Sequence, residues 1–440
     1  MKKVLILAYD FPPYVSVGGL RPYSWYKYFH EFGLYPVVVT RQWGNEYGNH
    51  LDYIAPGESD KTIIEESETG TIIRTAYKPN LSNRLLLKYG KKRFRLLRKA
   101  ITAYYEFMQF LFFVGPKAGL YRGAKQYLKQ QQVDAIIATG SPHILFKYAA
   151  KLSQKHNIPW IADYRDPWSH STTRSRNRFL LLWNRYFEKR FIKNTTIIST
   201  ATDFVKEKVS ELFPAKNVSV ILNGFDPEIR NNLKNEKPKT GILSFAFAGT
   251  VYPWHNFYKV IKTIVVWANK NEYDNIEIAL YGLNIKSEKT RILLSKLMEN
   301  NKQIRLYKKI DYARLLESLS KSHILLLFND YEFAGTKVYD YLAINRKILF
   351  CFTEEKADGF TMHPYFKHRN TEPNAVQVAI LNKSRTGVLA KGEKDLINQL
   401  NKLYEEFIET KTIACQAQDT DQYSRKVQAE KLAMLIIENV

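Results

Sequence analysis

The sequence predicts an α/β protein with two doubly wound, Rossmann-like domains, each a parallel sheet, facing each other across a cleft. Continuous apolar runs such as KVLILA (3–8) and HILLLF (323–328) have strand length without alternation, which is typical of strands buried on both faces. Such runs alternate with helical stretches through both halves. The chain of 440 residues is also long for a single core, so two domains are expected.

The domain boundary is indicated by the stretch PEIRNNLKNEKPKTG at 227–241. It is polar and interrupted by proline and glycine, a composition typical of linkers. We therefore expect an amino-terminal domain at 1–226, a linker at 227–241 and a second domain at 242–420.

Composition narrows the function classes. The chain has 66 basic and 43 acidic residues, a net charge of +23, and 14% aromatic residues, so an anionic partner such as nucleic acid, a nucleotide or a membrane leaflet is expected. No nucleic-acid-binding motif is present, which disfavours nucleic acid. The chain has two cysteines, too few for a disulfide framework, and the apolar run near its start is too short for a leader. It also lacks an apolar run long enough to span a membrane. These features favour a cytoplasmic protein. Scattered histidines without metal-ligand spacing predict no metal site.

The amino-terminal half opens with a strand at 3–8, the loop YDFPPYVSVGG and a helix at 20–32. Gly18 and Gly19 stand side by side, so the G-x-G-x-x-G spacing of dinucleotide-binding proteins is absent. Two interpretations remain for this pair: close approach of the backbone to a ligand, or a flexible turn.

Polar side chains follow the next strands of this half. The strand DAIIA (134–138) leads into TGSPH, which places His143 at a helix start. PWIAD (159–163) leads into Arg165 and Asp166, which either pair with each other or face a ligand. Ligands of open α/β sheets bind at the carboxyl ends of the strands, where these side chains are expected.

The segment 88–115 begins with a run of cations and continues with YYEFMQFLFFVG. One interpretation is a helix that lies on an anionic membrane surface. The other is a core helix with a solvated basic end.

The stretch 322–352 carries the highest density of useful groups. It reads as strand, loop, short helix and strand, with Glu332 in the loop, Gly335 at its end, and Thr336 and Lys337 at the helix start. A helix start favours a phosphate group, and Lys337 adds a full positive charge. Asp340, one turn further on, can accept hydrogen bonds from sugar hydroxyls.

This stretch resembles the donor-binding segment of retaining GT-B glycosyltransferases of family four. The family has a glutamate, seven residues and a second glutamate, and this chain has Glu332, seven residues and Asp340, followed by YLAINRKILF. Asn345 and Lys347 replace the usual glycine and proline. The FPP…GG opening of the chain is also similar to the amino terminus of that family.

The resemblance implies a role for each candidate. Glu332 would contact the donor sugar near its 3-hydroxyl, and Asp340 would hold the ribose. The diphosphate would meet a larger set, namely Gly18, Gly19, Arg21, Gly249, Thr250, Gly335, Thr336 and Lys337. His143 would touch the transferring sugar, Asp166 would orient the acceptor hydroxyl, and Arg165 and Asn223 would lie on the acceptor side.

One departure from the family concerns the residues after Gly249. The family usually has an arginine and a lysine there for the diphosphate, whereas this chain reads TVYPWHN. Lys337, Lys308 and Lys309 are the candidates to replace them.

The function that the resemblance implies is retaining transfer of a sugar from a nucleoside-diphosphate sugar to a glycan or lipid-linked glycan in cell-envelope polysaccharide synthesis. No metal cofactor is expected, because GT-B enzymes stabilise the leaving diphosphate with helix starts and cations. The final helix, about 421–440, would pack on the first domain, and 88–115 would dock on the inner face of the plasma membrane. Two alternatives remain: a GT-B epimerase acting on a nucleotide sugar, and a non-catalytic basic binding protein.

Overall fold

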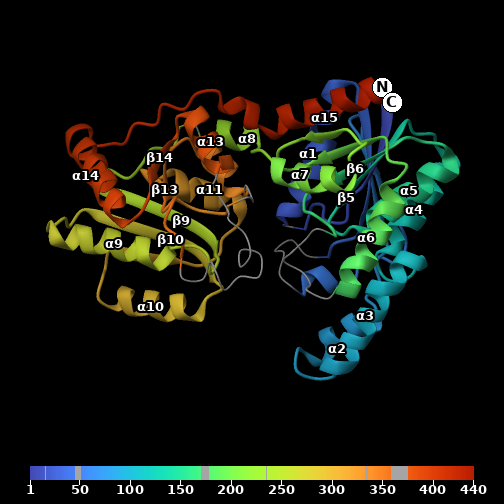
Figure 1. Ribbon diagram of the computed structural model, residues 1–440, viewed down its shortest axis with the longest axis horizontal. Helices are drawn as coiled ribbons and strands as arrows, with labels where there is room; N and C mark the ends of the chain where they lie inside the picture. The colour runs from blue at the N-terminus through green and yellow to red at the C-terminus, as the bar shows by residue number, and fades with distance from the viewer. Residues whose placement is uncertain (15, 45–50, 170–177, 234, 332–334, 358–374) are drawn as a thin grey trace. The chain divides into compact units, whose positions relative to one another are not determined.

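The computed structural model describes residues 1–14, 16–44, 51–169, 178–233, 235–331, 335–357 and 375–440. The chain divides into two compact units, Met1–Asn223 with Arg425–Val440, and Gly224–Ser424. Each unit contains one predominantly parallel sheet with helices packed on it (Figure 1). The predicted α/β fold with two parallel-sheet domains is thereby confirmed.

The sheet of the first unit has eight strands in the order β3-β4-β2-β1-β5-β6-β7-β8. All neighbours pair in parallel except β3 with β4. The strands are β1 (Lys2–Leu7), β2 (Leu34–Arg41), β3 (Ile63–Glu66), β4 (Thr71–Thr75), β5 (Ala135–Gly140), β6 (Trp160–Tyr164), β7 (Ile197–Thr200) and β8 (Val218–Val220). The carboxyl ends of the parallel strands therefore meet at one edge.

Helices cover both faces of this sheet. One face carries α1 (Val17–Tyr28), η1 (Phe29–Phe32) and α15 (Arg425–Asn439), whose Leu432 and Ile436 are fully buried with Val4 and Ile6 of β1. The other carries α4 (Ala118–Gln130), α5 (Ile144–His156) and α6 (Arg178–Ile192) (Figure 1). The unit also contains η2 (Asp52–Ile54) and α7 (Asp203–Leu212). The last helix of the chain thus completes the core of the first unit.

The segment predicted at 88–115 spans parts of two helices that extend from the sheet, α2 (Leu81–Tyr89) and α3 (Arg95–Leu111) (Figure 1). The two helices pack on each other, and the carboxyl-terminal part of α3 packs on α5. Phe110 of α3 is buried, whereas Leu96 and Leu97 are 81% and 50% exposed. The structure thus gives α3 a buried carboxyl-terminal part and an exposed apolar and basic part. Across the described ranges, no helix has the length and apolarity that a bilayer span requires.

The sheet of the second unit has six parallel strands in the order β11-β10-β9-β12-β13-β14. They are β9 (Leu243–Val251), β10 (Ile276–Ile285), β11 (Ile304–Tyr307), β12 (Ile324–Phe328), β13 (Lys347–Cys351) and β14 (Gly387–Ala390). The helices are α8 (Pro227–Leu233), α9 (Phe257–Lys270), α10 (Glu288–Glu299), α11 (Tyr312–Ser320), α12 (Lys337–Ile344), α13 (Ala375–Ser384) and α14 (Glu393–Thr410), with η3 at Thr420–Tyr423.

Part of the stretch expected to be a linker is a helix. Pro227 begins α8, where its fixed φ suits the first turn and its missing N–H costs nothing. The Asp226 carboxylate caps this start by accepting a hydrogen bond from the Glu228 N–H at 3.0 Å. Leu233 is buried, and α8 packs against α11 and α12. Residues 227–233 therefore belong to the second unit. The buried Leu233 and the capped helix start stabilise a helix here although the composition is polar.

Candidate functional site

In the second unit, the start of α12 lies against the end of β9. The Lys337 ammonium donates a hydrogen bond to the Thr250 carbonyl at 3.1 Å and lies 4.5 Å from the centroid of the Phe247 ring. A Cβ on Gly249 would lie 3.5 Å from Lys337 Cε. Three of the predicted diphosphate contacts, Gly249, Thr250 and Lys337, are therefore brought together by the fold.

The strand order explains this meeting. β9 and β12 are neighbours in the sheet, so the loop after β12 and the helix that follows it begin beside the carboxyl end of β9. Gly249 has φ of +93°, a conformation that glycine adopts without the strain a side chain would cause. The turn thus leaves the β9 backbone accessible to the lysine.

Burial and nearby charge act in opposite directions on Lys337. Burial lowers the pKa of the Lys337 ammonium, and the carboxylates of Asp330 and Asp340 partly offset that shift. The Thr250 carbonyl and the face of the Phe247 ring position the ammonium. Lys308 and Lys309 are both exposed, and the Lys309 backbone lies beside Gly282 of β10. Of the three candidate cations, Lys337 is the one in contact with Gly249.

The remaining predicted residues of this segment have definite environments. Asp340 accepts a hydrogen bond from the Tyr312 hydroxyl at 2.5 Å. Gly335 approaches the Asp330 carboxylate so closely that a Cβ there would collide with it. Thr336 is the residue that precedes α12, and no side-chain capping bond forms there. Glu332 lies outside the described residues.

Sequence reasoning missed a buried histidine and its acid in this unit. His255 Nε2 lies 3.1 Å from Asp330 Oδ1, and His255 is 6% exposed. Burial lowers the pKa of His255, and Asp330 opposes the shift. The pair ties the loop after β9 to the loop after β12, which are the two loops that flank Lys337. No spacing motif in the sequence marks this contact between residues 75 positions apart.

In the first unit, the glycine pair is part of helix α1, which begins at Val17 rather than at residue 20. The Gly18 N–H donates to the Ser16 hydroxyl at 3.1 Å and the Gly19 N–H to the Ser16 carbonyl at 3.0 Å. A Cβ on Gly18 would collide with the Arg165 guanidinium and the Asp10 carboxylate. The close approach that Gly18 permits is therefore to protein side chains, and both N–H groups already have acceptors. This geometry argues against the predicted diphosphate contact.

Arg21 also has a structural environment that differs from the prediction. Its guanidinium forms an ion pair with Asp163 of β6 at 2.7 Å and donates to the carbonyl of Leu222 at 3.0 Å. Asp163 further accepts from Thr139 and Ser199, each at 2.8 Å, and Arg21 is 3% exposed. Arg21 thus connects α1 to β6 and to the segment that follows β8. Because its guanidinium is buried and already paired with Asp163, this geometry argues against the predicted phosphate contact.

His143 lies at a pocket on the carboxyl edge of the first sheet. It precedes α5, is 6% exposed, and stacks on Trp168 with ring centroids 5.2 Å apart and an interplanar angle of 5°. Its Nε2 is 3.3 Å from the Asp166 carbonyl. Arg165 donates to the Gly140 carbonyl at 2.8 Å. The loops after β5 and β6 are thus fastened to each other beside the histidine.

The other acceptor-side predictions are more exposed. Asp166 is exposed and lies next to Arg165 in the loop after β6, while Asn223 is half-buried and is the last residue of the first segment of this unit. The structure places both near the carboxyl edge of the sheet through the strands that precede them.

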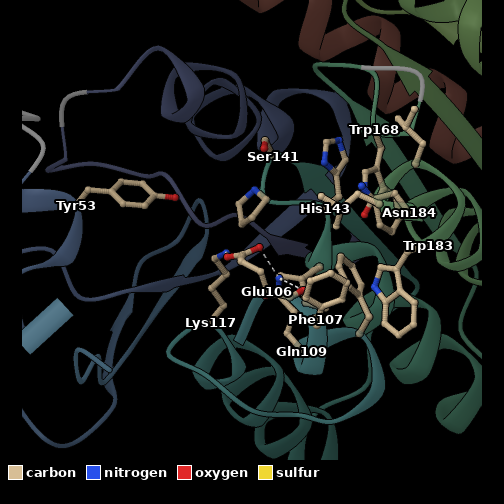
Figure 2. Close-up of a pocket in the computed structure, with 15 residues that line it drawn as sticks. Tyr53, Glu106, Phe107, Gln109, Lys117, Ser141, His143, Trp168, Trp183 and Asn184 are labelled. Atoms are coloured by element: carbon tan, nitrogen blue, oxygen red, sulfur yellow. Dashed lines mark hydrogen bonds and ion pairs between the residues drawn. The ribbon is translucent and has the colours of Figure 1, made fainter. Parts of the chain in front are cut away.

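The pocket at His143 has a volume of about 390 Å3 (Figure 2). Residues from η2, α3, α6, the starts of α4 and α5 and the loops after β5 and β6 line it: Tyr53, Glu106, Phe107, Gln109, Phe110, Lys117, Ser141, Pro142, His143, Ile144, Trp168, Leu180, Leu181, Trp183 and Asn184. Except for His143, the sequence did not single out these residues as ligand contacts. In the described part of the chain, no cluster of three or more His, Cys, Asp or Glu side chains could hold a metal ion.

Comparison with known proteins finds a matching family model. The model of Glycosyltransferase Family 4 matches residues 24–229. A search of curated proteins finds no match.

Solved structures resemble the whole chain. Sucrose-phosphate synthase from Thermosynechococcus elongatus superposes with a TM-score of 0.59 at 14% identity, covering 100% of this chain and 99% of that one. Anabaena Alr3699/HepE in complex with UDP and glucose gives 0.54 at 11% identity, with 100% of both chains covered. An E. coli structure titled trehalose-6-phosphate bound with UDP-2-fluoro glucose gives 0.53 at 11% identity, covering 100% and 96%. At these identities the likeness concerns the fold.

Proposed function

We propose that this chain, whose residues 24–229 match the model of Glycosyltransferase Family 4 and whose fold resembles that of solved GT-B glycosyltransferases, transfers a sugar, with retention, from a nucleoside-diphosphate sugar to a glycan or lipid-linked glycan of a cell-envelope polysaccharide. Two of the structural neighbours are described with UDP or a UDP-sugar. A UDP-hexose is therefore the first donor to test.

The observation that supports this proposal best is the position of Lys337 at Gly249. Negative charge develops on the leaving diphosphate as the glycosidic bond breaks, and a preorganised cation lowers the barrier by stabilising that charge. The ammonium is 3.1 Å from the Thr250 carbonyl. Lys337 is also at the amino end of α12, where the helix dipole contributes a partial positive charge of its own. Lys337 thus takes the place of the arginine and lysine that the family has after the glycine.

The other roles in the proposal follow the family pattern. Glu332 holds the donor sugar, Asp340 the ribose, and His143 contacts the transferring sugar. Asp166 orients the acceptor hydroxyl. Retention by front-face attack needs no nucleophile from the protein, so none is assigned. The proposed reaction needs no metal, and we expect addition of EDTA to leave the rate unchanged.

We also propose that the first unit docks on an anionic membrane surface through α2, α3 and the turn between them. Phe94 is 44% exposed, and Leu96 and Leu97 are 81% and 50% exposed. Within this segment, residues 88–99 carry seven cations, Lys88, Lys91, Lys92, Arg93, Arg95, Arg98 and Lys99. Exposed apolar side chains beside cations suit the boundary between headgroups and acyl chains.

The decisive test incubates the protein with a panel of UDP- and GDP-sugars, with and without glycan acceptors, and determines the anomeric configuration of any product. We expect transfer with retention, and loss of transfer in Glu332→Ala. An epimerised donor formed without acceptor would support the epimerase instead. Binding without turnover of any donor would support a non-catalytic protein.

A further inference from the structure

We propose that the acceptor is an amphipathic lipid-linked sugar, with its sugar in the His143 pocket and its apolar chain along a strip formed by α3 and α6. The inference rests on the proposed function and specifies the acceptor class. We call the apolar surface of Leu111, Phe112, Phe179, Leu182 and Tyr186 the α3–α6 strip.

One part of the pocket suits a neutral, hydroxyl-rich group. The Glu106 carboxylate accepts from the Gln109 amide at 2.8 Å and lies 3.3 Å from the Lys117 ammonium (Figure 2). His143 and Asn184 also line the pocket. The acid and the lysine offset each other, so this part offers donors and acceptors with little net charge, which matches sugar hydroxyls better than a diphosphate.

The other part of the pocket is aromatic. Trp183 packs edge-on against Phe107, with ring centroids 5.5 Å apart, and both line the cavity with Trp168. The indole nitrogen of Trp183 is buried and has no hydrogen-bond partner within the described part of the chain. A buried donor without an acceptor is costly. A ligand oxygen in the pocket would satisfy it while the rings cover the apolar face of the sugar.

The aromatic part continues to the protein surface. Phe179 stacks on Trp183 with centroids 6.1 Å apart and also lies 6.1 Å from Phe107, yet Phe179 is 60% exposed. Leu182 next to it on α6 is 67% exposed, and Phe112 at the end of α3 is 59% exposed. Aromatic contacts therefore lead without interruption from the cavity to the α3–α6 strip.

Charge on the same helix identifies the surface that covers this strip. Helix α6 also carries four cations among or beside these exposed apolar side chains. They are Arg178, Arg185, Lys189 and Arg190, and all four are exposed. An apolar strip bordered by cations complements an anionic lipid surface, because the cations meet headgroups while the apolar side chains reach the acyl boundary. A water-soluble acceptor would gain nothing from such a strip. The acceptor we infer therefore stays in the bilayer by its tail.

The test compares methyl and dodecyl glycosides of the same sugars as acceptors, in the full-length protein, with the donor that the panel identifies. We expect the KM for the dodecyl glycoside to be lower by about tenfold or more, since added apolar surface is removed from water. The double variant Phe179→Ser/Leu182→Ser should bring the two KM values together. Met434→Ser, which changes an apolar side chain of α15 that is 52% exposed, should keep the wild-type ratio.

A second readout does not depend on catalysis. Wild-type protein should float with phosphatidylglycerol vesicles more than with phosphatidylcholine vesicles, and the double variant should float less with both. Equal KM values for the two wild-type glycosides, with normal donor turnover, would overturn this inference and leave the proposed function standing. Absence of donor turnover with every acceptor would overturn both.

Discussion

Replacing Lys337 by methionine removes the positive charge beside Gly249 and keeps an unbranched apolar side chain against Phe247, whose ring the ammonium approaches to 4.5 Å. A hydrogen bond to a charged group contributes about 1.5–3 kcal/mol. With a tenfold change in rate for each ~1.4 kcal/mol of barrier, the loss in kcat/KM for the donor should be about 10- to 150-fold. Most of the loss should appear in kcat, because the charge on the leaving diphosphate grows in the transition state.

The pH profile gives an independent check of the same cation. Burial lowers the pKa of Lys337 in the folded protein, so a rising pH removes its proton earlier than it would from an exposed lysine. Activity should therefore fall on the alkaline side at a pH below the ordinary lysine value of about 10.4. Lys337→Met should lose this alkaline limb, because no proton remains to be lost.

Initial-rate measurements with varied donor at saturating acceptor provide the assay. Lys402→Met, which changes an exposed lysine of α14, is the matched control and should retain wild-type kinetics. The reasoning would be refuted if Lys337→Met stayed within about twofold of wild type. A larger loss in Lys308→Met or Lys309→Met would assign the role to that lysine instead.

Three further substitutions test the site and its scaffold. Asp340→Ala should raise the donor KM by about tenfold through loss of a charged hydrogen-bond acceptor, measured by initial rates. Gly18→Ala should destabilise the protein by about 1–3 kcal/mol through overpacking, and Arg165→Ala in the same chain should recover part of that loss in a denaturant melt. Arg21→Met should cost about 3–5 kcal/mol because it leaves the buried Asp163 carboxylate without its ion-pair partner, while Arg21→Met/Asp163→Asn should unfold at higher denaturant than Arg21→Met alone.

The sequence predicted both sheets because buried parallel strands leave a local signal. Runs such as 3–8 and 323–328 are apolar at every position after the first, and each contributes a strand at the centre of its sheet. The linker was a weaker prediction, since polar composition describes exposure and does not exclude a helix. Residues 227–233 form α8 with one buried leucine, and a single apolar position gives no detectable periodicity.

The glycine pair shows why residue type alone does not reveal the purpose of a close approach. Paired glycines after a proline-rich loop predict either close approach of the backbone to a ligand or a flexible turn, whereas the structure places protein side chains beside Gly18. The nearest of these is the Arg165 guanidinium, which comes from a loop 147 residues later in the sequence. For a related reason, the sequence predicts Arg21 to be a phosphate ligand: an arginine after a glycine loop gives the same sequence pattern whether its partner is a phosphate or the buried carboxylate of Asp163.

The proposed replacement of the family's cations by Lys337 depends on strand order rather than on local sequence. Lys337 and Thr250 are 87 positions apart, yet the adjacency of β9 and β12 brings the ammonium to the Thr250 carbonyl. The His255–Asp330 pair then fastens the two loops on which this contact depends. A cation from α12 can reach a diphosphate at the Gly249 turn as well as a cation that follows β9 can, provided that the two loops stay fixed relative to each other. Loss of the two basic residues after Gly249 is therefore compatible with diphosphate binding, and the dependence of that binding on His255 would distinguish this arrangement from one in which the cation follows the glycine directly.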